Sequence, residues 1–186
     1  MLPYNSPKLV AFLGNTGSRY AHTRHNVAWL VLDQHPFDDA RSWQRKFTAL
    51  WTRISIEGNQ VTLLKPQTMM NLSGESVQAA VRFFRFTPNE LVVVHDDVEL
   101  AFGRVGLRRG GGLAGHNGLR SVAHCLSTRD FWRLRIGVGR PTRGDLHNYV
   151  LGRFTPEEEI ELPRVVETAA ARLVDAVGRG LQSDAG

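Results

Sequence analysis

Several features are scarce or absent in this 186-residue sequence. Cys125 is the only cysteine, which excludes an intrachain disulfide. No apolar run comes near the roughly 20 residues that a membrane-spanning helix needs. The first residues, MLPYNSPKLVAFLG, lack the basic start, apolar stretch and small-residue cleavage site of a secretion signal. We therefore expect a soluble cytoplasmic protein, long enough to form one domain, residues 1–186, with a substantial core.

Acidic residues are scarce in one long segment. Between Gly103 and Gly144 the only acid is Asp130, and an acidic run, EEEIE, occupies 157–161 instead. The same segment holds nine arginines: Arg104, Arg108, Arg109, Arg120, Arg129, Arg133, Arg135, Arg140 and Arg143. Such one-sided charge favours a polyanion partner, so we predict a phosphate-contacting face. The alternative is an ordinary basic surface on a chain with a net charge of +5.

The motifs of several enzyme classes are also missing. One cysteine and scattered histidines show no paired zinc-ligand spacing, so we expect no metal and no cofactor. No G-x-x-x-x-G-K-[ST] and no G-x-S-x-G occurs, which argues against a P-loop enzyme and a common serine hydrolase. The stretch GGGLAG, 110–115, matches G-x-G-x-x-G, but no clear ribose-binding acid follows it. A nucleotide-binding enzyme is thus a weak alternative.

The apolar pattern predicts an α/β fold with a single-domain mixed β-sheet flanked by helices. Strands are expected at 8–13, 47–56, 60–65, 91–95 and 131–139, with a hairpin at EGNQ. The run LVVVH does not alternate, which indicates a strand buried on both faces. Strands that alternate with helices favour a layered α/β domain.

Helices are expected between these strands and after the last one. Thr23 is a candidate N-cap, and apolar residues with helical spacing occur at 77–84 and 119–126. The last helix has a capping box formed by Thr155 and Glu158, with Pro156 in its first turn. Its predicted inner face is formed by Ile160, Val165, Ala169, Leu173 and Ala176, and we expect a frayed tail from about 181.

Polar residues follow the predicted strands, where sites form in open α/β sheets. They are Asn15, His25, Asn71, Asp96, Asp97, His116 and Asn117. Each alone has an ordinary explanation as a turn former or helix cap. Together they supply a histidine that a carboxylate could orient to deprotonate water, with amides to stabilise an oxyanion. This set suffices to hydrolyse an activated ester without a covalent intermediate.

Five ordered stretches resemble the bacterial peptidyl-tRNA hydrolase family. They are LGNTGSRYAHTRHNVAWLVLD, KPQTMMNLSGESV, VVVHDDVELAFGRVGLRRGGGLAGHNGLRSV, RLRIGVGRP and YVLGRF, and they cover nearly the whole core of the sequence. The resemblance implies a monomeric, metal-free enzyme of α/β fold that cleaves the ester bond of peptidyl-tRNA. A non-catalytic RNA-binding protein on the same scaffold is the alternative.

The resemblance also implies roles for individual residues. His25 matches the base that activates water, Asp96 the carboxylate that keeps it basic, and Asn15 an asparagine that distinguishes peptidyl from aminoacyl substrates. The expected substrate-binding residues are Tyr20, Met69, Met70, Asn71, His116 and Asn117. Arg108, Arg109 and Arg133 are our first candidates for the phosphates of the tRNA acceptor arm.

Four residues depart from the family pattern. Thr16 replaces a proline, and Met69 replaces an aromatic residue whose stacking would be lost. Ala28 and Ala114 replace glycines. If the second position needs a positive φ, the alanine costs about 1 kcal/mol. None of the four changes removes His25, Asp96 or a candidate amide, so we expect activity.

Overall fold

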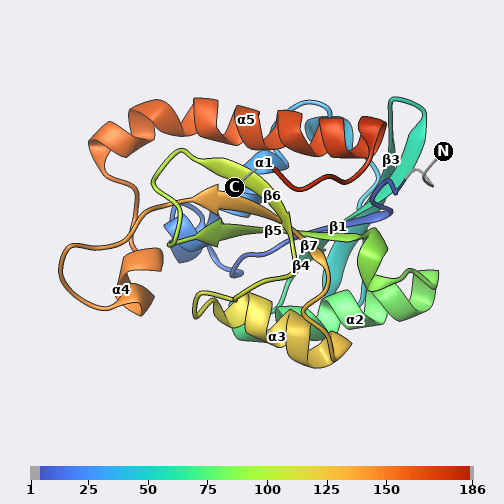
Figure 1. Cartoon of the computed structure of the whole chain (residues 1–186), viewed down its shortest axis with the longest axis horizontal. Helices are drawn as coiled ribbons and strands as arrows, with labels where there is room; N and C mark the ends of the chain where they lie inside the picture. The colour runs from blue at the N-terminus through green and yellow to red at the C-terminus, as the bar shows by residue number, and fades with distance from the viewer. Residues whose placement is uncertain (1–4, 185–186) are drawn as a thin grey trace.

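A seven-stranded mixed sheet crosses the protein in the order β2-β3-β4-β1-β5-β7-β6 (Figure 1). The structure is a computed structural model that describes residues 5–184. The strands are β1 (Leu9–Phe12), β2 (Gln44–Lys46), β3 (Ala49–Ile56), β4 (Asn59–Pro66), β5 (Leu91–Asp97), β6 (Val105–Arg109) and β7 (Trp132–Gly137). The four strands β4, β1, β5 and β7 are parallel, while β2, β3 and β6 pair in the antiparallel sense. The predicted mixed sheet is confirmed.

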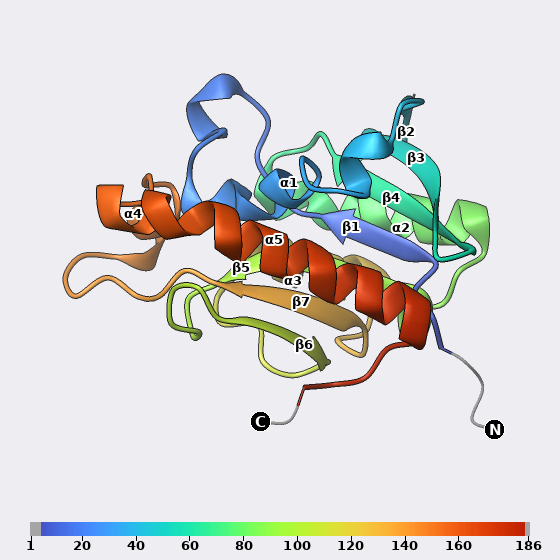
Figure 2. The same cartoon turned by 90° about the horizontal axis from the view of Figure 1, so that it is seen from above.

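Helices cover both faces of this sheet. Figure 1 shows α5 (Pro156–Arg179) and α1 (Val27–Val31) on one face, with α2 (Ser73–Phe84) and α3 (Asn117–Leu126) on the other. A short helix, α4 (Leu146–Val150), lies near the N-terminal end of α5 (Figure 2). Each face of the sheet has its own apolar cluster. None of the helices in the described part of the chain combines the length and apolar character that crossing a bilayer requires.

The central strands follow directly from the apolar pattern. All seven residues of β5 are buried, and the strand lies between β1 and β7, as the unbroken run LVVVH predicts. The predicted hairpin is also present, because β3 and β4 pair from Ala49↔Pro66 to Ile56↔Asn59. Glu57 and Gly58 both have positive φ, 49° and 82°, as a two-residue turn of type I′ requires.

The helix predictions hold with three corrections. The capping box of Thr155 and Glu158 opens α5 as predicted. Thr23 occupies the N-cap position of the 3-10 helix η2 (Arg24–Asn26), but its hydroxyl makes no capping hydrogen bond and donates instead to the carbonyl of Tyr20. Ile160 is not on the inner face; it is 77% exposed because the first turns of α5 extend beyond the ends of the strands (Figures 1 and 2).

The third correction concerns the C-terminal tail, which is packed as far as the structure describes it. Leu181 is buried and its amide donates to the carbonyl of Asn5. The amide of Asp184 donates to the carbonyl of Leu107, and its carboxylate accepts from the amide of Leu107 and from Arg172. The tail therefore covers part of the outer side of β6. Residues 185–186 lie outside the described residues.

The two strands that the sequence did not predict form the edges of the sheet. Strand β2 has three exposed residues, QRK, and β6 reads VGLRR. Basic side chains on an edge strand discourage pairing with another chain, and they also remove the apolar alternation that identifies a strand. Position in the sheet thus explains why both strands were missed.

Ala28 and Ala114, the two alanines that depart from the pattern of the resembling family, have different backbones. Ala114 has a φ of 49°, whereas Ala28 is fully buried in α1. We predict that Ala114→Gly raises the free energy of unfolding by about 1 kcal/mol, because it removes left-handed strain. The matched change Ala28→Gly should lower it by about 1 kcal/mol or more, because helix propensity and packing are lost. Urea denaturation measures both, and equal effects of the two changes would contradict the assignment.

Candidate active site

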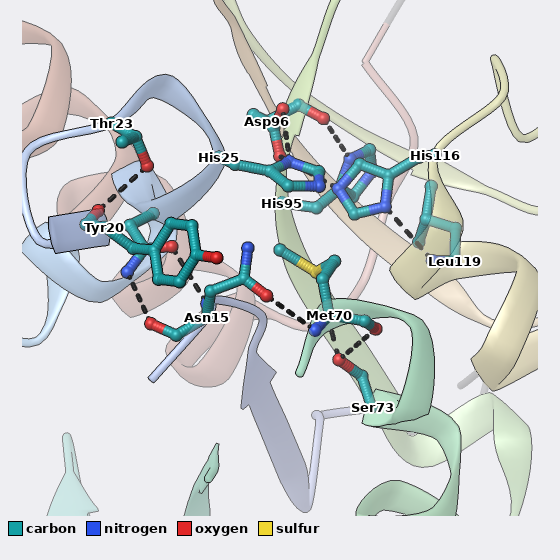
Figure 3. A network of polar contacts seen from close by, with 11 residues as sticks. Asn15, Tyr20, Thr23, His25, Met70, Ser73, His95, Asp96, His116 and Leu119 are labelled. Carbon is teal, nitrogen blue, oxygen red and sulfur yellow. Dashed lines mark hydrogen bonds and ion pairs between the residues drawn. The ribbon is translucent and has the colours of Figure 1, made fainter. Parts of the chain in front are cut away.

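Five segments from different parts of the chain meet at the carboxyl ends of β1 and β5. Asn15 follows β1, and Asp96 lies near the end of β5. His25 lies in η2 (Arg24–Asn26), Met70 begins η4 (Met70–Leu72), and His116 is the N-cap of α3. Figure 3 shows these side chains together. The predicted convergence at the strand ends is therefore present.

The carboxylate of Asp96 holds two imidazole rings. The Nδ1 atom of His25 lies 2.9 and 3.0 Å from the two carboxylate oxygens. The Nε2 atom of His116 lies 2.9 Å from Oδ1 of the same carboxylate. The three side chains are buried, and the rings of His25 and His116 are 4.7 Å apart. One carboxylate thus fixes the orientation of both rings.

Hydrogen bonds determine which nitrogen of each ring carries the proton. Nδ1 of His116 accepts from the amide of Leu119, so Nε2 carries the proton and donates to Asp96. Nδ1 of His25 donates to Asp96, which leaves its Nε2 as an acceptor. Nδ1 of His95, one residue before Asp96, donates to the carbonyl of Asp96. His25 is therefore oriented to accept a proton.

Burial and charge set the protonation of this group. Burial alone would lower the pKa of His25, but the charge and hydrogen bond of Asp96 outweigh it and raise the pKa above the ordinary value. Burial lowers the pKa of His116, and burial and His116 lower the pKa of His95 to about 3. Burial opposes the ionised form of Asp96, but His25 and His116 hold its pKa far below the usual range. A charged carboxylate therefore supports one basic imidazole and two neutral ones.

Hydrogen bonds hold Asn15 at its backbone amide, its backbone carbonyl and its side-chain oxygen, Oδ1. Oδ1 of Asn26 accepts from the amide of Asn15, and Nδ2 of Asn26 donates to its carbonyl, both at 2.9 Å. Oδ1 of Asn15 accepts from the amide of Met70 at 2.7 Å. Figure 3 shows the remaining atom, the amide nitrogen, on the side of the site where His25 lies. The side chain can donate a hydrogen bond there.

A cavity of about 100 Å³ adjoins the two histidines. Its lining includes His25, Asp96, His116 and Asn117, and also Leu146, His147 and Val150 from α4. The cavity has room for a few atoms of a ligand beside the free nitrogen of His25. Helix α4 is thus part of the site, although the apolar pattern of the sequence did not predict it.

The other candidates lie around this centre. Tyr20 is the last residue of η1 (Ser18–Tyr20) and is half-buried. Met69 is 42% exposed, and Asn71 and Asn117 are exposed. These positions are accessible to a large ligand.

The three candidate arginines have different surroundings. Arg108 is exposed, and its guanidinium lies against Gly111. Arg109 is paired with Asp130 through two hydrogen bonds of 2.7 Å. Arg133 is only 2% exposed and donates to the carbonyls of two loop glycines, Gly110 and Gly112. The buried guanidinium of Arg133 therefore holds the glycine loop, and its contact with a phosphate stays a prediction.

Sequence reasoning missed Asn26, His95 and the helix α4. Asn26 follows His25 directly, and its amide matches the two backbone groups of Asn15. The only available signal was the pair of polar residues at 25–26. The contacts of α4 arise from folding alone, since its residues are about 50 positions from Asp96 in the sequence.

The ligand atoms of His25, Asp96 and His116 lie within 4.8 Å of one another, which is close enough to hold a metal ion. In the structure these atoms are engaged with each other: the protonated nitrogens of both rings donate to the carboxylate. The three residues therefore satisfy one another without an ion. The donor set fits a hydrogen-bonded relay better than a metal centre.

Comparison with known proteins places this arrangement in a family. A family model described as peptidyl-tRNA hydrolase matches residues 9–185. The chain belongs to the peptidyl-tRNA hydrolase family. The peptidyl-tRNA hydrolase of Geotalea uraniireducens is 47% identical over 94% of this chain and 92% of its own length. That of Nocardia farcinica is 47% identical over 90% of this chain and 89% of its own length.

Solved structures of the peptidyl-tRNA hydrolase family agree with the fold. The crystal structure of peptidyl-tRNA hydrolase from Acinetobacter baumannii superposes with a TM-score of 0.86 at 33% sequence identity. The match covers 94% of this chain and 90% of that one. The predicted fold and family are both confirmed.

The histidine network leads to a prediction about the pKa values of His25 and His95. We predict that NMR titration finds the His25 pKa above about 6.5, and that Asp96→Asn moves it below that value because burial then acts alone. The His95 ring, whose pKa is lowered to about 3, serves as an internal control that stays neutral from about pH 5 to about pH 9. A His25 titration that is unchanged in Asp96→Asn would contradict the electrostatic role of the carboxylate.

Proposed function

We propose that this protein hydrolyses the ester bond between the peptide and the 3′ end of the tRNA in peptidyl-tRNA, with His25 as the base. The observation that carries the proposal is the bond of His25 Nδ1 to both oxygens of Asp96, which leaves Nε2 as the acceptor in a ring that lines the cavity. Membership of the family supports the substrate class. The comparisons give no support to a non-catalytic RNA-binding role.

The reaction needs one proton acceptor and one oxyanion donor. Nε2 of His25 removes a proton from water as the water oxygen attacks the ester carbonyl. The charge of Asp96 stabilises the imidazolium that forms. As the tetrahedral intermediate collapses, the bond to the ribose oxygen breaks, and that oxygen takes the proton from His25. The products are a peptide with a free carboxylate and a free tRNA.

Asn15 is the proposed oxyanion donor. Its Oδ1 is occupied by the amide of Met70, so its Nδ2 is the atom available to the substrate carbonyl. Asn26 fixes the backbone of Asn15, so the donor is already in position before the substrate binds. Preorganised donors of this kind contribute roughly 3 kcal/mol in the transition state.

Arg108 is the proposed contact for the phosphates of the acceptor arm. Its guanidinium is exposed, and Arg108 and Arg133 both lie against Gly111. Burial, and then the neighbouring cations Arg135 and Arg108, lower the pKa of Arg133 to about 10. Such crowding of positive charge attracts a phosphate, which relieves the repulsion. Arg109, already paired with Asp130, is a weaker candidate.

The residues around the centre are proposed to bind the 3′ end and the start of the peptide. Tyr20 and Met69 offer an aromatic and a thioether surface to the terminal nucleotide. Asn71 and Asn117 offer amides to the peptide backbone and the ribose, and Met70 and His116 shape the pocket between them. We propose that the protein does this as a monomer, because all these groups come from one chain.

One test of the proposed function concerns the catalytic base, His25. His25→Ala should lower kcat on purified peptidyl-tRNA by about 10²- to 10⁴-fold, because the proposed proton acceptor, Nε2 of His25, is removed. Binding of the tRNA should persist, as measured by filter binding. His22→Ala, an exposed histidine outside the site, is the matched control and should leave kcat unchanged. Near-normal turnover in His25→Ala would refute the assignment.

Another test concerns the proposed contact between Arg108 and the phosphates of the tRNA. Arg108→Ala should raise KM for peptidyl-tRNA and lower the slope of log KM against log salt by about 1, because the variant binds one phosphate fewer. The control is Arg164→Ala, which removes an exposed arginine of α5. Steady-state kinetics at several salt concentrations measure the effect. The same slope in both variants would exclude Arg108 as a phosphate ligand.

A further inference from the structure

Arg24, the residue before His25, is buried although the reaction does not use its charge. It is 6% exposed, and its Nε is buried with no acceptor among the described residues. A buried guanidinium is costly unless its other donors are well paired. The contacts of its two Nη atoms therefore show what the residue does.

These contacts all reach one segment that is distant in sequence. Nη1 donates to the carbonyl of Arg153 at 2.5 Å and to that of Tyr149 at 3.5 Å. Nη2 donates to Glu158 at 2.7 Å. The backbone amide of Arg24 also donates to the carbonyl of Gly152 at 3.0 Å. Arg24 thus joins η2 to the chain that leads from α4 into α5.

Aromatic rings complete the enclosure of this guanidinium. Its carbon lies 4.2 Å from the centre of the Tyr149 ring and 5.5 Å from that of Phe154. The hydroxyl of Tyr149 donates to the carbonyl of Val138, just after β7. Tyr149 is therefore fixed both by the sheet and by Arg24, through cation–π and hydrogen-bond contacts.

The segment held by Arg24 includes part of the lining of the cavity beside His25. Leu146, His147 and Val150 of α4 line this cavity together with His25. The carbonyl of Tyr149, in the same helix, accepts from Arg24, the neighbour of His25 in η2. One side chain therefore links the wall of the cavity to the short helix that carries the base.

We propose that Arg24 is a positioning residue that sets the width of the cavity by holding α4 against η2. The inference rests on the proposed function, since the cavity is taken to receive the ester end of the substrate. Arg24 acts on the placement of the substrate. Without its link to α4, this helix moves relative to His25 and the substrate binds less tightly. The basicity of His25 depends on Asp96 and stays the same.

Glu158 provides a way to separate positioning from stability. Its carboxylate accepts from Arg24 and also from the amide of Thr155, in the capping box of α5. Glu158→Gln keeps an oxygen for the cap but removes the charge opposite Arg24. Thr155→Ala weakens the same cap and leaves Arg24 and Glu158 in place. The pair of variants thus distinguishes the ion pair from the helix cap.

The test measures KM and kcat on purified peptidyl-tRNA together with thermal stability. Arg24→Gln should raise KM about tenfold with a smaller change in kcat, since small displacements of positioning groups have large effects. Glu158→Gln should raise KM about threefold, roughly 0.6 kcal/mol. Thr155→Ala should lower Tm with KM unchanged. The pH dependence of kcat should be the same in all of them.

Hydrogen exchange provides a second readout if Arg24→Gln folds poorly. In Glu158→Gln the amides of α4 should exchange faster than in Thr155→Ala, while those of β5 remain protected. Unchanged KM and unchanged α4 exchange in Glu158→Gln would overturn the proposal, as would an equal rise of KM in Thr155→Ala. If the unmodified protein does not cleave peptidyl-tRNA, the proposed function fails instead, and the exchange comparison still tests the link between Arg24 and α4.

Discussion

The carboxylate of Asp96, buried between two imidazole rings, is the constraint on which the site depends. It collects donors from η2 and from the N-cap of α3, so three distant parts of the chain must fold before its charge is satisfied. An ionised group this deep is strongly destabilising if a partner is missing. The same hydrogen bonds that make its burial tolerable also orient His25, so the requirements of folding and of catalysis coincide.

Three arginines near the site illustrate how burial divides the roles of one residue type. Arg24 and Arg133 are enclosed and donate to backbone carbonyls, and each fixes a segment of irregular chain. Arg108 keeps its guanidinium at the surface. A planar group with five donors suits both tasks, since it can bind several carbonyls at once or meet a phosphate. The number of positive charges in a sequence therefore overstates how many are available to a polyanion.

The sequence predicted the parts of the fold that depend on local pattern. The unbroken apolar run of β5, the hairpin of β3 and β4 and the capping box of α5 were recognisable, because one stretch of chain contains the whole signal. Ordered motifs also indicated the family and the candidate residues His25, Asp96 and Asn15, which the structure brings together. Charged edge strands, the buried state of Arg133 and the packing of α4 were not predictable, because each depends on neighbours distant in sequence.

The interior position of Arg133 also determines how the glycine loop presents its backbone. A trans peptide unit directs its carbonyl and its N–H in opposite directions. Because the carbonyls of Gly110 and Gly112 turn inward to the guanidinium, the N–H groups of Gly111 and Leu113 turn outward. These carbonyl oxygens of the loop thus point inward and these N–H groups point outward. This arrangement depends on Arg133 and not on a side chain of the loop. The outer rim of the loop therefore presents main-chain N–H groups, which carry partial positive charge.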